Sequence, residues 1–262
     1  MTPSTVKSLF ELVNEHPSED RSAIFEDLWG ILAELRAKMD ARFMLHPHPS
    51  TADFQPYTSL TGEAKGFLSG FSGNEIDWLI HSYIGNPKAS FTNMHLTAWL
   101  GAQTRVPHWG MALGTSPDIF LYMDFVPRAD LVSDLDYLDR YYEPLNARYL
   151  DFQKDPNFSP FVSKSLYMRQ SQSATSLCFL CKPRAENVAK IRTTAHAMLD
   201  QWIAYVDAAP PVPEDERAAL ARRDLHVRRA IAERDPANPM GEILFGKPLA
   251  ERLIRALWGG DR

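Results

Sequence analysis

The chain has 262 residues, of which 45% are hydrophobic and 23% are charged, and its net charge at pH 7 is -5. This hydrophobic content can fill a sizeable core, and the acidic balance argues against nucleic acid as a general partner. The length allows one or two domains, and because no flexible linker separates two halves, we expect a single domain over residues 1–262.

The N-terminal residues 1–16 interleave charged and apolar side chains and contain no continuous hydrophobic segment. We therefore expect neither a signal peptide nor a membrane span, and we predict a cytoplasmic protein. A helix is predicted over residues 20–44, because leucines and isoleucines recur there at spacings of three and four. A polar, proline-containing loop follows over residues 46–62.

Apolar stretches of strand length occupy the middle of the chain and are separated by turn signals such as Asn86-Pro87. The strands predicted in this region cover residues 66–71, 76–84, 90–100, 105–113 and 118–125. Two further strands are predicted over residues 163–170 and 175–181.

Helical periodicity returns in the second half. The predicted helices cover residues 131–152, with a kink at Pro144, and residues 186–206, 213–234 and 248–258. Strands thus gather in the middle while helices flank both ends. This order predicts an α+β fold, an α/β/α sandwich with a central, largely antiparallel sheet flanked by helices.

Asp124 is the most informative residue, because it is a carboxylate in the apolar run from Ile119 to Phe125. Period-two alternation places Asp124 on one face of the strand with Phe120 and Tyr122, and the intervening apolar residues on the other face. The carboxylate is therefore expected to face an aromatic-lined space.

The two preceding strands show the same pattern. Alternation groups His108 with small residues, and it places His95 and Thr97 on one face with Asn93 and Trp99. If these strands pair as an antiparallel meander, their polar faces form the floor of one pocket. A purely structural role stays open, since a single histidine or aspartate near a strand end is more often a hydrogen-bonded structural residue.

Another polar set lies in the predicted strand over residues 163–170. Alternation aligns Arg169 with serine and tyrosine side chains, and Ser171 and Ser173 follow. Hydroxyl groups around a guanidinium suit a carboxylate or a phosphate. The alternative is an exposed edge strand.

The chain contains two cysteines, Cys178 and Cys181, in an apolar run. Residues three apart in a strand point to opposite faces, and there is no second cysteine pair for a zinc site. We expect free structural thiols and no metal site.

An arginine cluster consisting of Arg222, Arg223, Arg228 and Arg229 falls in a predicted helix. It is either a solvated helix face or a docking patch for an acidic partner. The chain contains no P-loop, no G-x-G-x-x-G, no H-E-x-x-H and no G-x-S-x-G, so it carries no flavin, nicotinamide or nucleotide signature.

Several segments, read in order between residues 76 and 258, match one known pattern. They are residues 76–80 and 82–84 (IDWLI, SYI), 130–142 (DLVSDLDYLDRYY), 159–169 (SPFVSKSLYMR), 173–176 (SATS), 222–224 with 228–229 (RRD, RR) and 245–246 (FG). Together they resemble red chlorophyll catabolite reductase, which belongs with the ferredoxin-dependent bilin reductases.

The resemblance also implies roles for single residues. Asp124 falls on a strand aspartate of the family, and His108 falls about where the biliverdin-reducing members carry a strand histidine. Asp235 is close to the position of a C-terminal loop aspartate that the family uses as a proton donor, with Glu233 as a competing assignment.

Two family residues are absent. Ala112 stands where red chlorophyll catabolite reductase has a strand glutamate, and Thr97 stands where the biliverdin reducers have another. The substrate and the position of reduction therefore stay open.

Proteins that resemble this one bind an open-chain tetrapyrrole, hold no cofactor of their own and receive electrons singly from reduced ferredoxin, so the protein must supply protons. The resemblance thus implies ferredoxin-dependent reduction of biliverdin or a related bilin, with His108, Asp124 and Asp235 as catalytic residues. The residues expected to bind the pigment are His95, Thr97, Arg169, Ser171 and Ser173. Because ferredoxins are acidic, the arginine cluster becomes a candidate docking face.

Two other functions remain open. A bilin-binding or carrier protein without reductase activity would explain the two missing carboxylates. A cofactor-free enzyme acting on another flat conjugated molecule is the third possibility.

Overall fold

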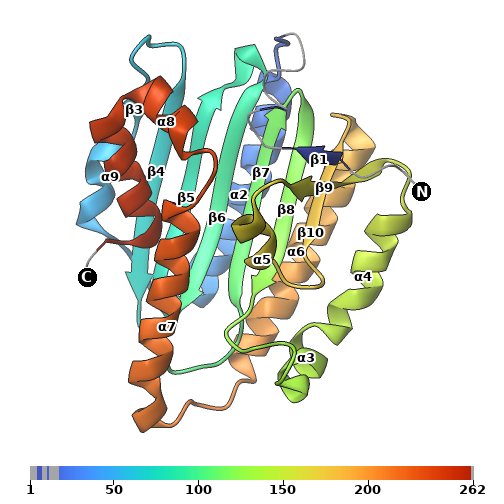
Figure 1. Ribbon diagram of the computed structural model, residues 1–262, viewed down its shortest axis with the longest axis vertical. Helices are drawn as coiled ribbons and strands as arrows, with labels where there is room; N and C mark the ends of the chain where they lie inside the picture. Colours follow the sequence, from blue (N-terminus) through green and yellow to red (C-terminus); the bar gives the residue numbers. More distant parts are fainter. Residues whose placement is uncertain (1–4, 8–10, 12–17, 261–262) are drawn as a thin grey trace.

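One large sheet forms the centre of the protein in a computed structural model, which describes residues 5–7, 11 and 18–260 (Figure 1). Its strand order is β1-β9-β10-β8-β7-β6-β5-β4-β2, with β3 also paired to β4. The strands are β1 (Thr5–Lys7), β2 (Leu45–Pro47), β3 (Tyr57–Thr58), β4 (Lys65–Gly73), β5 (Ile76–Asn86), β6 (Phe91–Leu100), β7 (His108–Ser116), β8 (Asp118–Val126), β9 (Phe158–Ser163) and β10 (Leu177–Cys181).

The described strands pair antiparallel, except that β1 runs parallel to β9. Strands β4 to β8 form a meander, in which each strand pairs with the next along the chain. The prediction of a central, largely antiparallel sheet is confirmed, and so are the five strands predicted between residues 66 and 125.

Helices cover both faces of the sheet, as the sandwich prediction required. In Figure 1, α2 and α6 lie behind the sheet, while α5, α7, α8 and α9 lie in front of it. The helices are α2 (Ser22–Arg42), α3 (Leu135–Tyr141), α4 (Glu143–Lys154), α5 (Leu166–Gln170), α6 (Ala185–Asp207), α7 (Glu214–Glu233), α8 (Asn238–Phe245) and α9 (Lys247–Trp258), with short 3₁₀ helices at Pro49–Phe54 and Pro87–Ala89.

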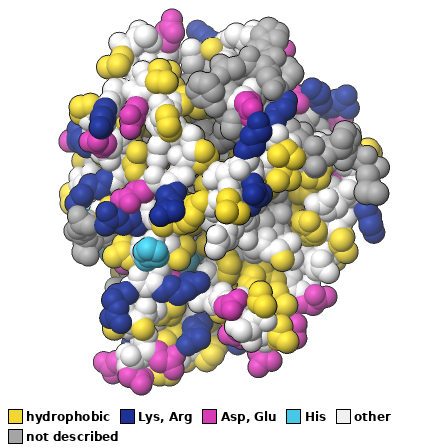
Figure 2. Space-filling view, viewed as in Figure 1, with side chains coloured by type: hydrophobic (Ala, Val, Ile, Leu, Met, Phe, Trp, Pro, Cys, Tyr) yellow, Lys and Arg dark blue, Asp and Glu magenta, His cyan; other side chains and the backbone are white. Residues whose placement is uncertain are grey.

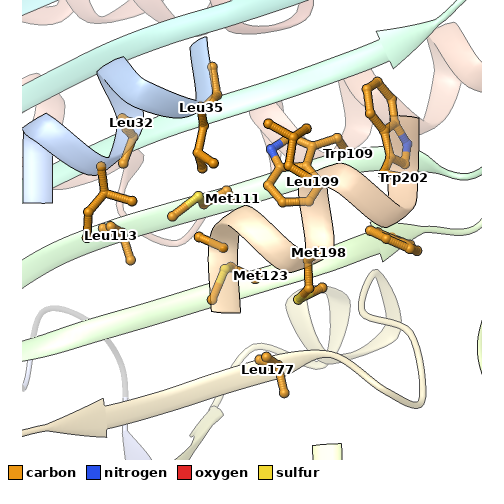
Figure 3. Close-up of a cluster of buried hydrophobic side chains, with 14 of the residues drawn as sticks. Leu32, Leu35, Trp109, Met111, Leu113, Met123, Leu177, Met198, Leu199 and Trp202 are labelled. Carbon is orange, nitrogen blue, oxygen red and sulfur yellow. The ribbon is translucent and has the colours of Figure 1, made fainter. Parts of the chain in front are cut away.

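The main core lies between the sheet and the helices α2 and α6 (Figure 3). The leucines of α2 and the Met198-Leu199 pair of α6 pack on the apolar side of β7 and β8, to which Met111 and Met123 belong. Alternation assigns every second residue of these strands to this core, because successive side chains point to opposite faces. The intervening residues, including Asp124, are therefore directed to the front of the sheet.

The front helices bury only part of that opposite face. Trp78 and Ile80 of β5 pack with Leu253 of α9, and the Trp78 indole donates a 3.0 Å hydrogen bond to the carbonyl oxygen of Ala256. This smaller core covers the β4–β5 half of the sheet. The half formed by β6, β7, β8 and β10 lies under α5, the end of α7 and the α7–α8 connector, and it encloses the candidate site described below.

Two predicted elements differ from the structure. The strand predicted over residues 163–170 is wrong, because β9 ends at Ser163 and Leu166–Gln170 is the helix α5, whose first turn is capped by the Ser165 hydroxyl. The helix predicted over residues 131–152 is divided into α3 and α4 at Tyr142, just before Pro144. Helix α8 was not predicted, although Pro239 in its first turn is a typical helix-start residue.

Candidate functional site

The floor of the site is built from three rows of residues that cross β6, β7 and β8. The register aligns Asn93, Gly114 and Phe120 in one row, His95, Ala112 and Tyr122 in the next, and Thr97, Gly110 and Asp124 in the third. Because the middle strand contributes only glycine and alanine, polar side chains on the outer strands flank an open strip. This matches the pocket floor that was predicted on the polar face of the meander.

A cavity of about 150 Å³, called here the main cavity, lies over this floor. Residues of β9, α5 and α7 cover it, together with Asp235 and Pro236 of the α7–α8 connector. A side cavity of about 110 Å³ adjoins it under α8 and α9 and is lined mainly by apolar side chains. Asn93, His95 and Asp235 line both cavities and therefore form the seam between them.

Asp124 belongs to the third row of the floor but does not line the main cavity, and 1% of its surface is exposed. Burial raises the pKa of its carboxyl group to about 7, although the hydrogen bonds from Ser173 oppose this rise. Ser173 donates its backbone N–H to Oδ2 at 2.8 Å and its hydroxyl to Oδ1 at 2.5 Å. The carboxyl group is thus held in place and titrates near neutral pH.

Tyr122 separates Asp124 from the main cavity. Its ring lies against Gly110, where an added Cβ would be 3.4 Å from the Tyr122 hydroxyl, and that hydroxyl lies 3.5 Å from Oδ2 of Asp124. Tyr122 lines the cavity, whereas Asp124 does not. Strand alternation placed Tyr122 on the correct face, but no role was predicted for it. The signal was its position two residues before Asp124 in the same strand.

Asp235 and His95 line the seam on opposite sides. Asp235 belongs to the α7–α8 connector, and His95 belongs to β6. Burial raises the pKa of Asp235, while the backbone N–H of Ala237, 2.8 Å from Oδ1, partly offsets this effect. Burial lowers the pKa of His95 to about 4, so its imidazole is neutral at physiological pH. The competing residue Glu233 is exposed and pairs with Arg229 instead.

His108 does not line the main cavity, although its strand face was expected to form one pocket floor with that of Asp124. Its Nδ1 accepts a 3.0 Å hydrogen bond from the backbone N–H of Leu100, and its Nε2 lies 3.3 Å from Oδ1 of Asp224 on α7. Its ring packs against Trp99, with 4.7 Å between the ring centroids, and Trp99 rather than His108 lines the main cavity. The physical reason is that α7 supplies a buried carboxylate which the strand pattern could not reveal.

Asp224 also binds the fully buried guanidinium of Arg128, through Nε at 3.1 Å and Nη2 at 2.6 Å. Burial by itself raises a carboxyl pKa, but His108 and Arg128 together bring the pKa of Asp224 below its usual range. Burial lowers the pKa of His108 to about 4, which leaves the imidazole neutral with its proton on Nε2, because Nδ1 is an acceptor. This cluster joins α7 to the end of the β6–β7 hairpin.

The guanidinium of Arg169 and the two serines predicted beside it, Ser171 and Ser173, are separated in the structure. Ser171 lines the main cavity, whereas Ser173 does not line it and donates a hydrogen bond to Asp124. Arg169 is exposed on α5 and donates hydrogen bonds to the carbonyl oxygens of Ser163 and Lys164 at 2.7 and 3.0 Å. The segment is helical rather than extended, so the expected alignment on one strand face is wrong. Thr97 lines the cavity, as its strand face implied.

The arginine cluster is also divided. Arg228 is 5% exposed and forms a 2.7 Å ion pair with Asp77 of β5, so it helps to attach α7 to the sheet. Arg222, Arg223 and Arg229 are exposed. Figure 2 shows basic side chains gathered over α7.

The two thiols point to opposite faces, as predicted from their spacing. Cys178 lines the main cavity, whereas Cys181 belongs to the core on the α2–α6 side. Both are free in the structure, and burial raises the pKa of each thiol to about 12. Neither is an activated nucleophile.

Three plant proteins that are similar to this chain are all red chlorophyll catabolite reductases. A similar protein from Oryza sativa subsp. japonica, red chlorophyll catabolite reductase 1, is 28% identical over 224 residues, which cover 79% of this chain and 68% of that protein. The Arabidopsis thaliana red chlorophyll catabolite reductase is 25% identical over 249 residues, covering 87% and 78%. The Hordeum vulgare protein is 24% identical over 188 residues, covering 67% and 90%.

The fold is shared with a solved structure, phytochromobilin synthase from tomato in complex with biliverdin. The TM-score is 0.72 at 15% sequence identity, and the match covers 88% of this chain and 82% of that one. The predicted bilin reductase fold is therefore confirmed.

The expectation of a cytoplasmic protein is wrong, because the relatives from rice and Arabidopsis are chloroplastic. That expectation rested on residues 1–16, most of which lie outside the part of the chain that the structure describes. Among the described helices, none has the length and apolar character needed to cross a bilayer.

The family model of red chlorophyll catabolite reductase matches residues 29–258, which include every strand of the β4–β8 meander and all residues that line the two cavities. The resemblance seen in the sequence is thereby confirmed. The chain belongs to the red chlorophyll catabolite reductase family.

Proposed function

We propose that this protein reduces a linear tetrapyrrole, biliverdin or a related bilin, with electrons that arrive one at a time from reduced ferredoxin. The observation that carries the proposal is the position of two carboxyl groups with raised pKa values on opposite sides of the main cavity, Asp124 on a strand of the floor and Asp235 in the cover. Membership of the family and the fold shared with a biliverdin-bound protein support it.

The chemistry of reduction defines what the side chains must do. Two electrons and two protons added to a conjugated pigment remove one double bond, and the atoms that receive the protons determine which bond is lost. Because the electron donor supplies no protons, the protein must hold them at chosen positions. Carboxylic acids with a pKa near neutrality can hold and release a proton at working pH.

Asp124 meets this requirement, since a pKa of about 7 leaves a large fraction of the carboxyl groups protonated at neutral pH. A proton that leaves Asp124 for the cavity must pass Tyr122, whose hydroxyl lies 3.5 Å from Oδ2. We therefore include Tyr122 in the proton path. Asp235 would deliver the second proton from the opposite side of the pigment.

The histidines act differently in this proposal. His95 is neutral and serves as a hydrogen-bond partner of the pigment beside Thr97. His108, with Nδ1 engaged by Leu100 and Nε2 directed to Asp224, is a positioning residue for Trp99 rather than a proton donor.

A pigment of this size needs both cavities. Pockets for drug-sized ligands measure about 300–1,000 Å³, whereas the main and side cavities measure about 150 and 110 Å³. Binding must therefore displace the Asp235 side of the seam, which belongs to a connector and not to the sheet. Ser171 at the wall and Arg169 on the adjacent surface of α5 are our candidates for the propionate carboxylates.

The exposed arginines of α7 are the proposed ferredoxin docking face, namely Arg222, Arg223 and Arg229. Ferredoxins are acidic, so this contact would be favoured by charge complementarity and weakened by salt. Helix α7 ends beside the cavity cover, where Ile231 lines the main cavity. An electron donor on this helix would thus lie close to the pigment.

The test is to mix the purified protein with biliverdin, ferredoxin, a ferredoxin reductase and NADPH. A time-dependent change of the pigment absorbance that needs every component supports reduction. A static spectral shift that does not progress supports the second candidate, a bilin carrier, which the missing family glutamates at Ala112 and Thr97 favour. Absence of any spectral change with biliverdin or another bilin contradicts both functions.

A further inference from the structure

Asn93 carries an unused hydrogen-bond acceptor at the seam of the two cavities. Its Oδ1 atom is buried and has no hydrogen-bond partner. Among the residues that the structure describes, it is the single side-chain atom of this kind that belongs to a cavity-lining residue. Buried polar groups in folded proteins are nearly always paired, so such an atom calls for a partner from outside the chain.

The neighbouring strands explain why the protein does not satisfy this atom. Asn93 is aligned with Ile84 of β5 on one side and with Gly114 of β7 on the other, and neither residue has a side-chain donor. Phe120 of β8, which follows Gly114 in the same row, has none either. Asn93 thus lines both cavities, while its buried amide oxygen has no hydrogen-bond donor from the protein.

We propose that Oδ1 of Asn93 accepts a hydrogen bond from a pyrrole or lactam N–H of the bound pigment. This inference rests on the proposed function and specifies how the substrate is oriented. In its ring-like conformation a linear tetrapyrrole directs its ring nitrogens to the inner edge, and it carries methyl, vinyl and propionate substituents on the outer edge. With the inner edge at Asn93, methyl and vinyl groups of the outer edge can enter the apolar side cavity, which Leu244, Leu253 and Leu257 line.

His95 is the second polar side chain that this orientation of the pigment brings into use. His95 lies two residues further along the same strand face and lines both cavities. Its neutral imidazole offers one donor and one acceptor. The two side chains together present polar groups to the pigment at the level where Asp235 closes the seam.

The test compares biliverdin binding by the wild-type protein and by Asn93→Leu, which preserves size but removes the acceptor. Loss of one hydrogen bond to a desolvated N–H is expected to weaken binding roughly tenfold to a hundredfold. The midpoint of thermal unfolding without pigment should stay the same or rise, because the variant removes an unsatisfied buried group. Weaker binding with unchanged or higher stability separates a ligand contact from misfolding.

Two further measurements sharpen the result. Asn157→Leu, at an exposed position before β9, is the matched control and should bind biliverdin like the wild type. A biliverdin methylated at the contacted nitrogen should bind the wild type and Asn93→Leu with equal affinity, since the donor is then gone.

The outcomes are distinguishable. If the wild type binds and reduces biliverdin while Asn93→Leu binds it equally well, the inference is wrong and the proposed function stands. In that case a water molecule satisfies the amide. If the wild type binds no bilin, the proposed function and the inference fail together.

Discussion

Ser173 donates two hydrogen bonds to the carboxyl group of Asp124, one from its backbone N–H at 2.8 Å and one from its hydroxyl at 2.5 Å. The two residues are 49 positions apart in the chain. Both hydrogen bonds favour the charged carboxylate, and they oppose the larger effect of burial, which favours the neutral acid. Ser173 thus sets how far above its usual range the Asp124 pKa lies.

Replacing Ser173 by alanine should move the pH dependence of turnover. The variant keeps the backbone hydrogen bond but loses the hydroxyl, so the pKa of Asp124 rises above about 7. A proton donor acts in its protonated form, and a higher pKa keeps it protonated to higher pH. We expect the alkaline limb of the kcat profile to shift upward by roughly one pH unit. Ser176→Ala, at a buried serine whose hydroxyl has no partner, should leave the profile unchanged. An unshifted limb in Ser173→Ala would show that Asp124 is not the titrating donor.

Asp124→Asn should separate pigment binding from reduction. The side chain does not line the main cavity, so biliverdin affinity is expected to change little. Turnover should fall about 10²- to 10⁴-fold, which is the usual contribution of a positioned acid. Absorbance after a single addition of reduced ferredoxin measures this directly. Asp118→Asn is the control on the same strand, because Asp118 pairs with Lys182 at the protein surface. Product formation at the wild-type rate in Asp124→Asn would remove Asp124 from the mechanism.

The same substitution makes a prediction about stability. An aspartate with a pKa of about 7 in the folded state and about 3.9 in the unfolded state binds its proton more tightly when folded. The bound proton therefore stabilises the folded state fully below about pH 4. This stabilisation, up to about 4 kcal/mol of the free energy of unfolding, is lost as the pH rises from 4 to 7. Asparagine has no such titration. The free energy of unfolding of Asp124→Asn minus that of the wild type should increase between pH 4.5 and pH 8 in denaturant titrations. A difference that does not vary with pH would mean that the Asp124 pKa is not raised.

Gly110→Val tests the cavity floor. A Cβ at this position would lie 3.2 Å from Cγ2 of Val126 and 3.4 Å from the Tyr122 ring, and the two valine methyl groups extend beyond it. They should displace Tyr122 into the main cavity and weaken biliverdin binding by tenfold or more, which corresponds to a loss of about 1.4 kcal/mol of binding free energy. Gly30→Ala is the matched control, since nothing lies within 4 Å of an added Cβ there. Binding that Gly110→Val leaves intact would place the pigment elsewhere.

Asp224→Asn should destabilise the protein without any pigment present. The substitution leaves the guanidinium of Arg128, whose side chain is 0% exposed, without its charged partner. Removing one member of a buried pair typically costs about 3–5 kcal/mol. Asp200→Asn breaks the ion pair with Lys38, in which the aspartate is 59% exposed, and should cost at most about 1 kcal/mol. Equal costs for the two variants in chemical denaturation would contradict a structural role for the Asp224 cluster.

The local pattern of residues was enough to predict much of the fold and the side of the sheet that carries the site. Alternation in β6, β7 and β8 needs only the two-residue period of a strand, so His95, Thr97 and Tyr122 could be assigned to the cavity face without any knowledge of their neighbours. The spacing of apolar residues in α2 was sufficient to predict that helix, because the helical repeat also spans only a few residues.

The partners of the polar side chains depend on how distant segments pack together. Strand alternation predicted His108 on one pocket floor with Asp124, yet α7 brings Asp224 to its ring, and Arg228 of the same helix forms an ion pair with Asp77. Arg169 was predicted on a strand face, but it lies in the helix α5, whose first turn is capped by Ser165. Local periodicity determines which face a side chain occupies. Its hydrogen-bond partner can come from a residue more than a hundred positions away, and that contact exists only once the layers have assembled.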